Sequence, residues 1–210
     1  MNSIRFFAFV IIFLIAVFSV FPQTAPDALN EYRQGNYERS VQICRDEIAA
    51  NPNNLESHVV ISWSLVKLGR FDEALNYART ARSLSRYDPR VAEILGEIYF
   101  YQGNNGEAMR YFQEYVNIAP TGARIELGYY FIGEIFIRTA KYRHADIALS
   151  TAVHWQPSNP AWWTRLGYAR ENAGDYIQAV EAYEKAIALN SQLTDARRGL
   201  ERVRQTLGNR

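Results

Sequence analysis

Residues 160–193 read PAWWTRLGYARENAGDYIQAVEAYEKAIALNSQL, and this stretch decides the fold. Large side chains at Trp163, Leu166 and Arg170 recur at intervals of three and four residues before Gly174, as they do along one face of an α-helix. A second run with helical periodicity follows the glycine. The stretch therefore predicts two helices that fold back on each other around a short turn.

This turn recurs along the chain at a nearly constant interval. Equivalent turns are centred on Gly35, Gly69, Gly103, Ala140 and Gly174, so successive turns are 34, 34, 37 and 34 residues apart. A fixed period of a few tens of residues is the sequence signature of a repeat architecture. The chain is therefore expected to be a stack of similar helical hairpins.

Several positions recur together within this period. The three best units carry Leu95, Gly96, Tyr99, Gly103, Ala108, Phe112 and Pro120; then Tyr129, Ile132, Gly133, Phe136, Tyr142, Ala145, Leu149, Ala152 and Pro157; then Trp163, Leu166, Gly167, Gly174, Tyr176, Ala179, Tyr183 and Ala186. A period near 34 that carries these residues resembles the tetratricopeptide repeat. The resemblance covers nearly all of the chain after residue 23.

The resemblance implies an all-α fold, a right-handed superhelix of about five antiparallel helical hairpins plus a C-terminal capping helix. The expected units are a degenerate first repeat at 24–54, repeats at 55–88, 89–122, 126–159 and 160–193, and a capping helix at 194–210. The three extra residues between Pro120 and Glu126 either shift the superhelix or lengthen a turn.

Small residues are expected where the two helices of a hairpin cross, because helices approach closely only where side chains are small. In this family the crossing positions correspond to Gly96, Gly133 and Gly167 on the first helices and to Ala108, Ala145 and Ala179 on the second helices. The unit at 55–88 departs from this pattern, since Ser62 replaces the glycine and Ala78 replaces an aromatic residue. Pro52, Pro120 and Pro157 are expected to close the second helices of their units.

Residues 6–21 are sixteen residues without a charge, preceded by Arg5. In a helix they would span about 24 Å, less than the roughly 30 Å hydrocarbon core of a bilayer. Residues 1–23 are therefore expected to be a cleaved signal peptide or, alternatively, an N-terminal membrane anchor. Either places the folded part outside the cytoplasm, in the periplasm or anchored to the inner membrane and facing the periplasm. A buried helix of a cytoplasmic protein fits less well, because this run has no polar face.

The charge balance argues against one class of function, and the single cysteine excludes a disulfide within the chain. Lys and Arg total 23 while Asp and Glu total 22, and this absence of a basic excess argues against general nucleic-acid binding. Cys44 is the only cysteine, so no disulfide can form within the chain.

No constellation of residues predicts catalysis. His58, His144 and His154 fall at different positions of different repeats, without a cysteine or a carboxylate pair beside them. Gly103 and Gly106 lie in a hairpin turn and not between a strand and a helix, so no phosphate loop is indicated. We therefore expect a protein that is not an enzyme and that has no metal or other cofactor.

In this family the first helices of the hairpins line a concave groove, and one stripe of each helix faces it. That stripe predicts the following partner-binding residues: Val59, Trp63, Val66, Glu93, Glu97, Phe100, Tyr130, Glu134, Ile137, Arg138, Thr164, Tyr168 and Glu171. Aromatic rings supply contact area and carboxylates favour Lys or Arg, so the lining predicts a protein or peptide segment with apolar and basic residues. Alternatively, the aromatic side chains pack between neighbouring helices and the glutamates are merely solvated.

The leading interpretation is a protein-protein interaction scaffold of the cell envelope that binds a peptide or protein segment in the groove. The alternative is a small-ligand-binding or transport-accessory protein in which Trp63, Phe100, Tyr130 and Tyr168 line an enclosed pocket. A dry cavity of several hundred Å³ would favour that alternative. The sequence does not define the oligomeric state, and a homodimer through an uncovered end or face is a further alternative.

Overall fold

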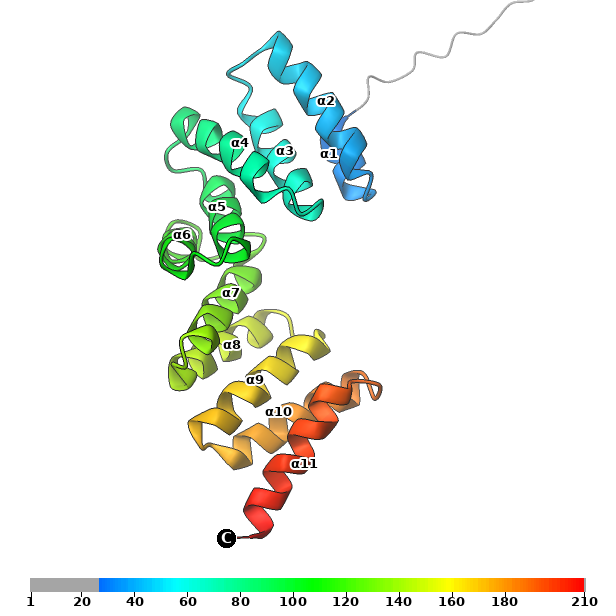
Figure 1. Cartoon of the computed structure of the whole chain (residues 1–210), viewed down its shortest axis with the longest axis vertical. Helices are drawn as coiled ribbons and strands as arrows, with labels where there is room; N and C mark the ends of the chain where they lie inside the picture. Colours follow the sequence, from blue (N-terminus) through cyan, green and yellow to red (C-terminus); the bar gives the residue numbers. More distant parts are fainter. Residues whose placement is uncertain (1–26, 210) are drawn as a thin grey trace, which may run out of the picture.

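The computed structural model describes residues 27–209, and this part of the chain consists of α-helices, turns and short loops without a strand. The helices are α1 (Ala28–Arg33), α2 (Tyr37–Ala50), α3 (Leu55–Lys67), α4 (Phe71–Leu84), α5 (Pro89–Tyr101), α6 (Asn105–Ile118), α7 (Ile125–Arg138), α8 (Tyr142–Trp155), α9 (Pro160–Ala173), α10 (Tyr176–Leu189) and α11 (Thr194–Gly208). They follow one another from one end of an elongated molecule to the other (Figure 1). The signal peptide or anchor expected at residues 1–23 lies outside the described residues.

The helices pair into five hairpins, each made of an odd-numbered helix and the even-numbered helix that follows it, and α11 packs against both α9 and α10. This arrangement confirms the predicted all-α architecture of five hairpins and a capping helix. The final helix buries Ala196, Gly199 and Val203 against the last hairpin, so it covers apolar surface that the hairpin would otherwise expose.

The hairpin turns adopt the left-handed backbone conformation that their sequences predict. Gly35, Gly69, Gly103 and Gly174 have φ values of +83°, +73°, +78° and +85°. The remaining turn, fourth along the chain, has Ala140 at φ +54°, where a side chain is sterically unfavourable. The turns that the sequence places at 34- or 37-residue intervals are therefore confirmed, including the one that lacks glycine.

Three of the loops between hairpins start the next helix with a polar cap, and two of these also start it with proline. Asn54, Asp88 and Asn159 accept hydrogen bonds from backbone N–H groups in the first turns of α3, α5 and α9, and prolines begin α5 and α9. The three prolines expected to close second helices each lie two residues beyond the last residue of α2, α6 and α8. These loops therefore fix where one hairpin ends and the next begins.

The glycines predicted at the helix crossings lie there, and each meets a large side chain of the second helix 16 positions later. The predicted alanines Ala108, Ala145 and Ala179 are fully buried, but their atoms are not the ones nearest to these glycines. A Cβ atom at Gly96 would lie 2.9 Å from the Phe112 ring, and one at Gly167 would lie 2.7 Å from the Tyr183 ring. Gly133 lies against Leu149 in the same way. In the second hairpin the corresponding residues are Ser62 and Ala78, both fully buried, so a larger residue on the first helix accompanies a smaller one on the second.

The first helices form a continuous row, whereas the second helices stand apart. Each of α1, α3, α5 and α7 contacts the next first helix, and α9 contacts α11. We call α1, α3, α5, α7 and α9 the first-helix row. No Cα atoms of neighbouring second helices come within 8 Å of each other among the described residues. Ion pairs between Arg45 and Glu73 and between Arg82 and Glu114, both at 2.6 Å, bridge α2 to α4 and α4 to α6.

Most of the extra residues after α6 lengthen the connection between α6 and α7. Six residues separate α6 from α7, whereas four separate the other successive hairpins, and α7 is one residue longer than α5. In the longer connection, Arg124 is the residue directly before α7. Its side chain reaches back to Glu93 on α5 of the preceding hairpin. The insertion therefore supplies a charged side chain to the first-helix row.

Candidate partner-binding site

All thirteen residues predicted to bind a partner lie on α3, α5, α7 and α9, but they differ in how much of each is exposed. Six are buried among the described residues: Val59, Val66, Glu93, Glu97, Phe100 and Glu134. The other seven are partly or fully exposed: Trp63, Tyr130, Ile137, Arg138, Thr164, Tyr168 and Glu171. While these helices keep their present packing, the second group offers surface to a partner directly, and a buried residue can be reached only where it lines a pocket.

The carboxylates of Glu93 and Glu97 share one arginine of the same chain. Arg124 donates from Nη1 to Glu93 Oε2 at 2.9 Å and from Nη2 to Glu97 Oε1 at 2.5 Å. Both glutamates are almost completely buried, and the nearby carboxylates help to raise the pKa of Arg124. The residue that the insertion places before α7 therefore neutralises charge that α5 buries.

The other two predicted carboxylates also bind arginines of this chain. Arg165 on α9 donates two hydrogen bonds to Glu134 on α7, and Arg202 on α11 donates two to Glu171 on α9. Glu171 also accepts a hydrogen bond of 2.6 Å from the Tyr183 hydroxyl. All four predicted carboxylates therefore already bind arginines of this chain, which reduces the attraction that they offer to basic residues of a partner.

A simple spacing underlies these ion pairs. Arg124, Arg165 and Arg202 each lie 31 residues after the glutamate that they bind, namely Glu93, Glu134 and Glu171. Because 31 residues is slightly less than one repeat, each arginine lies near the start or middle of the helix that follows in the row or caps it. A search of the sequence for opposite charges at this interval would have identified the three arginines, which the groove prediction did not include.

Glu93 differs from the other three glutamates because one of its oxygens is buried without a hydrogen-bond partner among the described residues. Its Oε1 atom is buried and makes no hydrogen bond with any described residue, and the same is true of the indole N–H of Trp63. Burial, reinforced by the nearby Glu97 carboxylate, raises the pKa of Glu93 well above its usual range. This corner of the first-helix row therefore holds a buried acceptor and a buried donor that make no hydrogen bond of ordinary geometry among the described residues, although the Trp63 indole lies close enough to Glu93 to lower the pKa of that carboxyl in part.

A pocket of about 170 Å³ lies beside these two groups. Its lining comes from α3, from α5 and α6 and from the long connection before α7: Trp63, Pro89, Arg90, Glu93, Tyr115, Ala119, Gly122, Ala123 and Arg124. The volume is below the roughly 300 Å³ at which pockets for drug-sized ligands begin, so it fits a single side chain better than a small molecule. Phe100, Tyr130 and Tyr168 are not part of its lining.

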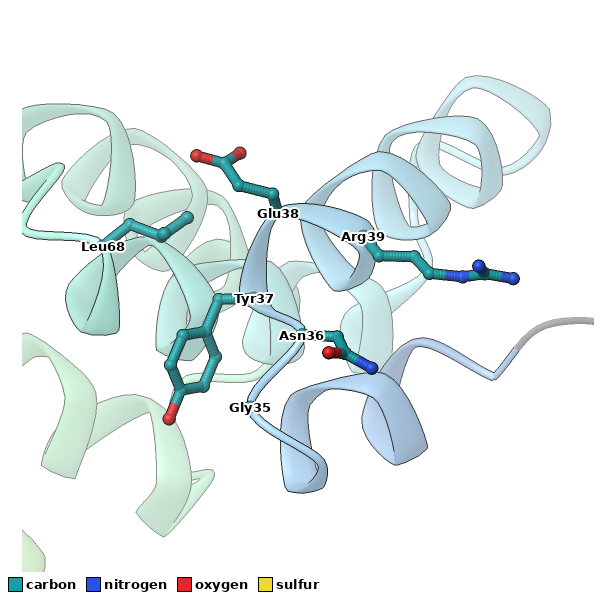
Figure 2. A pocket seen from close by; sticks show the side chains of 6 residues that line it. All are labelled: Gly35, Asn36, Tyr37, Glu38, Arg39 and Leu68. Atoms are coloured by element: carbon teal, nitrogen blue, oxygen red, sulfur yellow. The ribbon is translucent and has the colours of Figure 1, made fainter.

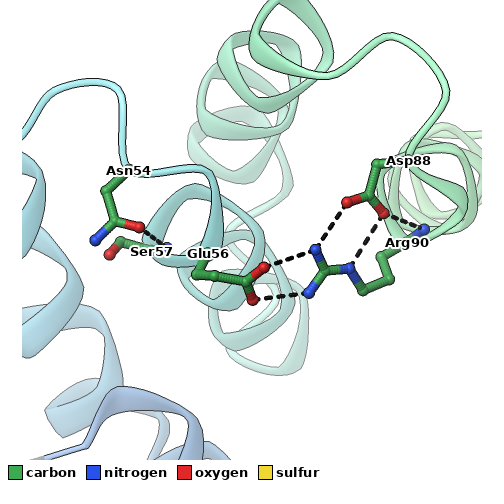
Figure 3. A network of polar contacts seen from close by, with 5 residues as sticks. All are labelled: Asn54, Glu56, Ser57, Asp88 and Arg90. Carbon is green, nitrogen blue, oxygen red and sulfur yellow. Dashed lines mark hydrogen bonds and ion pairs between the residues drawn. The ribbon is translucent and has the colours of Figure 1, made fainter.

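One wall of the pocket is fixed by a polar network (Figure 3). Arg90 binds both oxygens of Glu56 at 2.7 and 2.8 Å, and it also binds Asp88 at 2.7 and 3.1 Å. Asp88 caps α5, while Asn54, 34 residues earlier, caps α3 by accepting from the Ser57 N–H at 3.3 Å. The Arg90 guanidinium is therefore already engaged by two carboxylates and holds the beginnings of α3 and α5 together.

Aromatic rings connect the helices of the row, and two of them were not among the predicted residues. Tyr32 on α1 lies 5.8 Å from the Trp63 ring, and Trp162 on α9 stacks on Tyr130 at 4.9 Å. The Arg138 guanidinium lies 3.5 Å from the centre of the Phe100 ring and covers it. The aromatic side chains thus pack between neighbouring helices, yet Trp63, Tyr130 and Tyr168 keep part of their surface exposed.

A larger hollow of about 480 Å³ lies at the first hairpin turn, lined by residues 35–39 and Leu68 (Figure 2). The same hollow recurs 34 residues later, lined by residues 69–73 and Gln102. Its charged side chains in the first turn are paired, Glu38 with Arg70 at 3.3 Å and Arg39 with Glu31 at 3.0 Å. We therefore interpret this hollow as a by-product of stacking hairpins and not as a specific site.

Residues 27–209 contain neither a cluster of metal-ligating side chains nor a helix suited to cross a membrane. Their His, Cys, Asp and Glu side chains form no group of three or more that could hold a metal ion. Within the same residues no helix combines the length and the apolar character that crossing a membrane requires. His58 is buried and donates from Nε2 to the carbonyl oxygen of Pro52 at 2.9 Å.

Comparison with known families agrees with the repeat seen in the structure. A family model described as tetratricopeptide repeat matches residues 60–123, and a second model with the same description matches residues 160–193. The second match has the same limits as the last predicted repeat.

Relatives match the sequence of the chain, and solved structures match its fold, at low identity. Human cilia- and flagella-associated protein 70 is 24% identical over 136 residues, which are 65% of this chain and only 12% of that protein. The crystal structure of PilW, described as a widely conserved type IV pilus biogenesis factor, has a TM-score of 0.73 at 20% identity and covers 87% of this chain and 83% of its own. MamA from Desulfovibrio magneticus RS-1 has a TM-score of 0.67 at 17% identity, over 80% of this chain and 93% of its own. At these identities the two structures show a shared fold.

Proposed function

Because the chain belongs to the tetratricopeptide repeat family, we propose that it is a protein-protein interaction scaffold of the cell envelope that holds a segment of another protein along its first-helix row. Proteins of this family generally bind protein partners, and we propose the same kind of interaction for this chain. The envelope location and the place where the partner binds are the more specific parts of the proposal.

The observation that carries the proposal is the presence of partly exposed aromatic side chains on three of the five first helices. Trp63 on α3, Tyr130 on α7 and Tyr168 on α9 each keep part of their surface exposed in the first-helix row. Aromatic side chains lose little conformational entropy on binding and dominate many protein interfaces. A peptide that runs along the row would meet one such ring on each of these helices.

The chemistry of the partner follows from what the row leaves available. Glu97, Glu134 and Glu171 are bound by arginines of this chain, so they add little attraction for a basic partner. We therefore propose a partner segment whose main anchors are apolar side chains that pack against the exposed rings. Catalysis is not part of the proposal, because the carboxylates of the row are held by arginines instead of converging on an open site.

The proposed location rests on the uncharged run at residues 6–21 and on one similar structure. A signal peptide or an anchor in that run would export the repeats, which would then lie in the periplasm or face it from the inner membrane. PilW, whose fold resembles this one, is described as a pilus biogenesis factor. A comparable place in an envelope assembly agrees with both observations.

Crosslinking in intact cells, followed by affinity capture and mass spectrometry, tests the proposal. The variant Tyr130→Ala with Tyr168→Ala removes two exposed rings of the row, and Ile147→Ala with Ile177→Ala is a matched control on the second helices, where both isoleucines are about two-thirds exposed. We expect envelope proteins that the wild type and the control capture and that the row variant loses, with unchanged helical content by circular dichroism. Equal capture by the row variant would refute the placement, and capture limited to cytoplasmic proteins would refute the location.

A further inference from the structure

The Glu93 corner of the row carries more negative than positive charge when its carboxylates are ionised. Glu93 and Glu97 are both buried, and Arg124 is the guanidinium that binds them. The other nearby cation, Arg90, is occupied by Glu56 and Asp88. When both glutamates are ionised, one buried carboxylate therefore lacks its own counter-charge among the described residues, and Glu93 Oε1 accepts no hydrogen bond from them. Burial raises the pKa of Glu93 and so favours its protonated form, and a cation bound beside it would displace that proton by stabilising the ionised carboxylate.

The pocket beside Glu93 has the shape and surface for one long side chain. Its volume of about 170 Å³ is comparable to a single large side chain, and most of its lining is apolar, from Trp63, Pro89, Ala119 and parts of its other residues. A side chain that fills it would place an alkyl or aromatic body against these walls and its tip near Glu93 Oε1. The tip must donate a hydrogen bond, because an ionised carboxylate is only an acceptor.

We propose that this pocket receives one lysine side chain of the partner, with its alkyl stem against Trp63 and Pro89 and its ammonium group bound to Glu93. The inference rests on the proposed function, since it names one anchor of the protein segment that the row would hold. A lysine combines the four-carbon apolar stem that the walls suit with a compact cation that carries three donors. It supplies both the missing donor and the missing positive charge.

Other occupants satisfy fewer of these requirements. An arginine has a larger, planar head that would compete with Arg124 for the same carboxylates. A neutral alcohol or a water molecule could donate to Glu93, but it would leave the buried negative charge uncompensated. A purely apolar side chain would fill the walls and leave Glu93 Oε1 without a partner.

The first test is an NMR titration of the full chain, labelled with nitrogen-15, with n-butylammonium chloride as the probe. The indole N–H signal of Trp63 reports on the pocket, and it is assigned by its loss in Trp63→Phe. 1-Butanol has the same alkyl chain without a charge and serves as the matched probe. We expect a saturable shift of the Trp63 signal with butylammonium and at least about tenfold weaker binding of butanol. No shift, or equal shifts with both probes, would overturn the proposal.

Two variants connect this result to the carboxylate. Glu93→Gln keeps the size of the side chain and removes its charge, and we expect it to weaken butylammonium binding at least about tenfold. Glu134→Gln is the control, because Glu134 lies outside the pocket and both its oxygens are bound by Arg165. Retained binding by Glu93→Gln, in a protein whose other amide signals show that it is folded, would also overturn the proposal.

The outcome is separable from the test of the proposed function. The capture variants change Tyr130 and Tyr168, which do not line this pocket. Butylammonium binding without capture of any protein would retain the cation pocket and refute the scaffold role along the row. Capture that depends on the two tyrosines, without butylammonium binding, would retain the scaffold role and refute the lysine.

Discussion

Arg165 holds Glu134 with two parallel hydrogen bonds, Nε to Oε1 at 2.6 Å and Nη2 to Oε2 at 2.8 Å, across the boundary between the fourth and fifth hairpins. The carboxylate side chain is 11% exposed and the guanidinium side chain is 35% exposed. This pair is one of three that join residues 31 positions apart, so it represents how the first-helix row is held together.

Removal of the Arg165 guanidinium should destabilise the stack. We expect Arg165→Met to lower the free energy of unfolding by about 1–3 kcal/mol, because the mostly buried Glu134 carboxylate loses both its donors. Urea denaturation followed by circular dichroism measures the change. Arg110→Met is the control, since the Arg110–Glu107 pair is about half exposed and solvent screening should leave it with little effect on stability. Equal effects of the two substitutions would contradict the structural role of the 31-residue pairs.

The crossing of α5 and α6 should tolerate no added methyl group. We expect Gly96→Ala to lower the free energy of unfolding by about 1–3 kcal/mol, because the new Cβ atom would lie 2.9 Å from the Phe112 ring. Gly106→Ala is a matched control at the start of α6, where the nearest atom lies 3.8 Å away. It should leave stability unchanged or raise it slightly. Thermal unfolding of the two variants decides this, and a stable Gly96→Ala protein would show that the hairpin can open without cost.

The turn at Ala140 should gain stability from glycine. Ala140 has φ +54°, whereas glycine occupies the other four hairpin turns with positive φ. We expect Ala140→Gly to raise the free energy of unfolding by about 0.5–1 kcal/mol, since glycine removes the steric cost of this conformation. The reverse change at an equivalent turn, Gly103→Ala, should lower stability by a similar amount. Urea denaturation of the two variants measures both changes. If both substitutions changed the free energy of unfolding in the same direction, the steric cost at Ala140 would be contradicted.

The buried Glu93 carboxyl should make stability depend on pH. It faces Glu97 and Arg124, and Trp63 and Tyr115 pack beside it. Burial raises its pKa in the folded protein, so the folded state holds this proton more tightly than the unfolded chain. Relative to Glu93→Gln, the wild type should therefore lose stability as pH rises above the unfolded pKa of about 4.5, until the raised pKa is passed. Parallel pH profiles of the two proteins would show that Glu93 does not titrate in this way.

The fold could be predicted from the sequence because each hairpin is specified locally. Turn residues, small crossing residues and closing prolines recur at fixed intervals, and even the exchange of glycine for Ser62 is matched by Ala78, 16 residues later. Such signals depend on one helix and its immediate neighbour along the chain. These signals can therefore be recognised in the sequence without a structure.

The lining of the row could be predicted only in part, because it depends on how successive hairpins rotate against each other. The helix stripe identified Trp63, Tyr130 and Tyr168, which remain partly exposed. It also included Glu93 and Val59, which the neighbouring helices bury. Whether a carboxylate of one repeat faces solvent or an arginine of the next is a property of the stack and not of a single helix.

The ion pairs that bridge the second helices have a mechanical consequence. Arg45–Glu73 and Arg82–Glu114 span the outer side of the first three hairpins, where the helix backbones stay apart, while rings and apolar side chains pack within the row on the inner side. Both bridges are accessible to ions of the solvent, which screen charges over about 8 Å at physiological ionic strength and about 3 Å at 1 M. The stack should therefore resist bending more strongly in dilute buffer than in concentrated salt, so that the ionic strength of its compartment adjusts the elasticity of the N-terminal half.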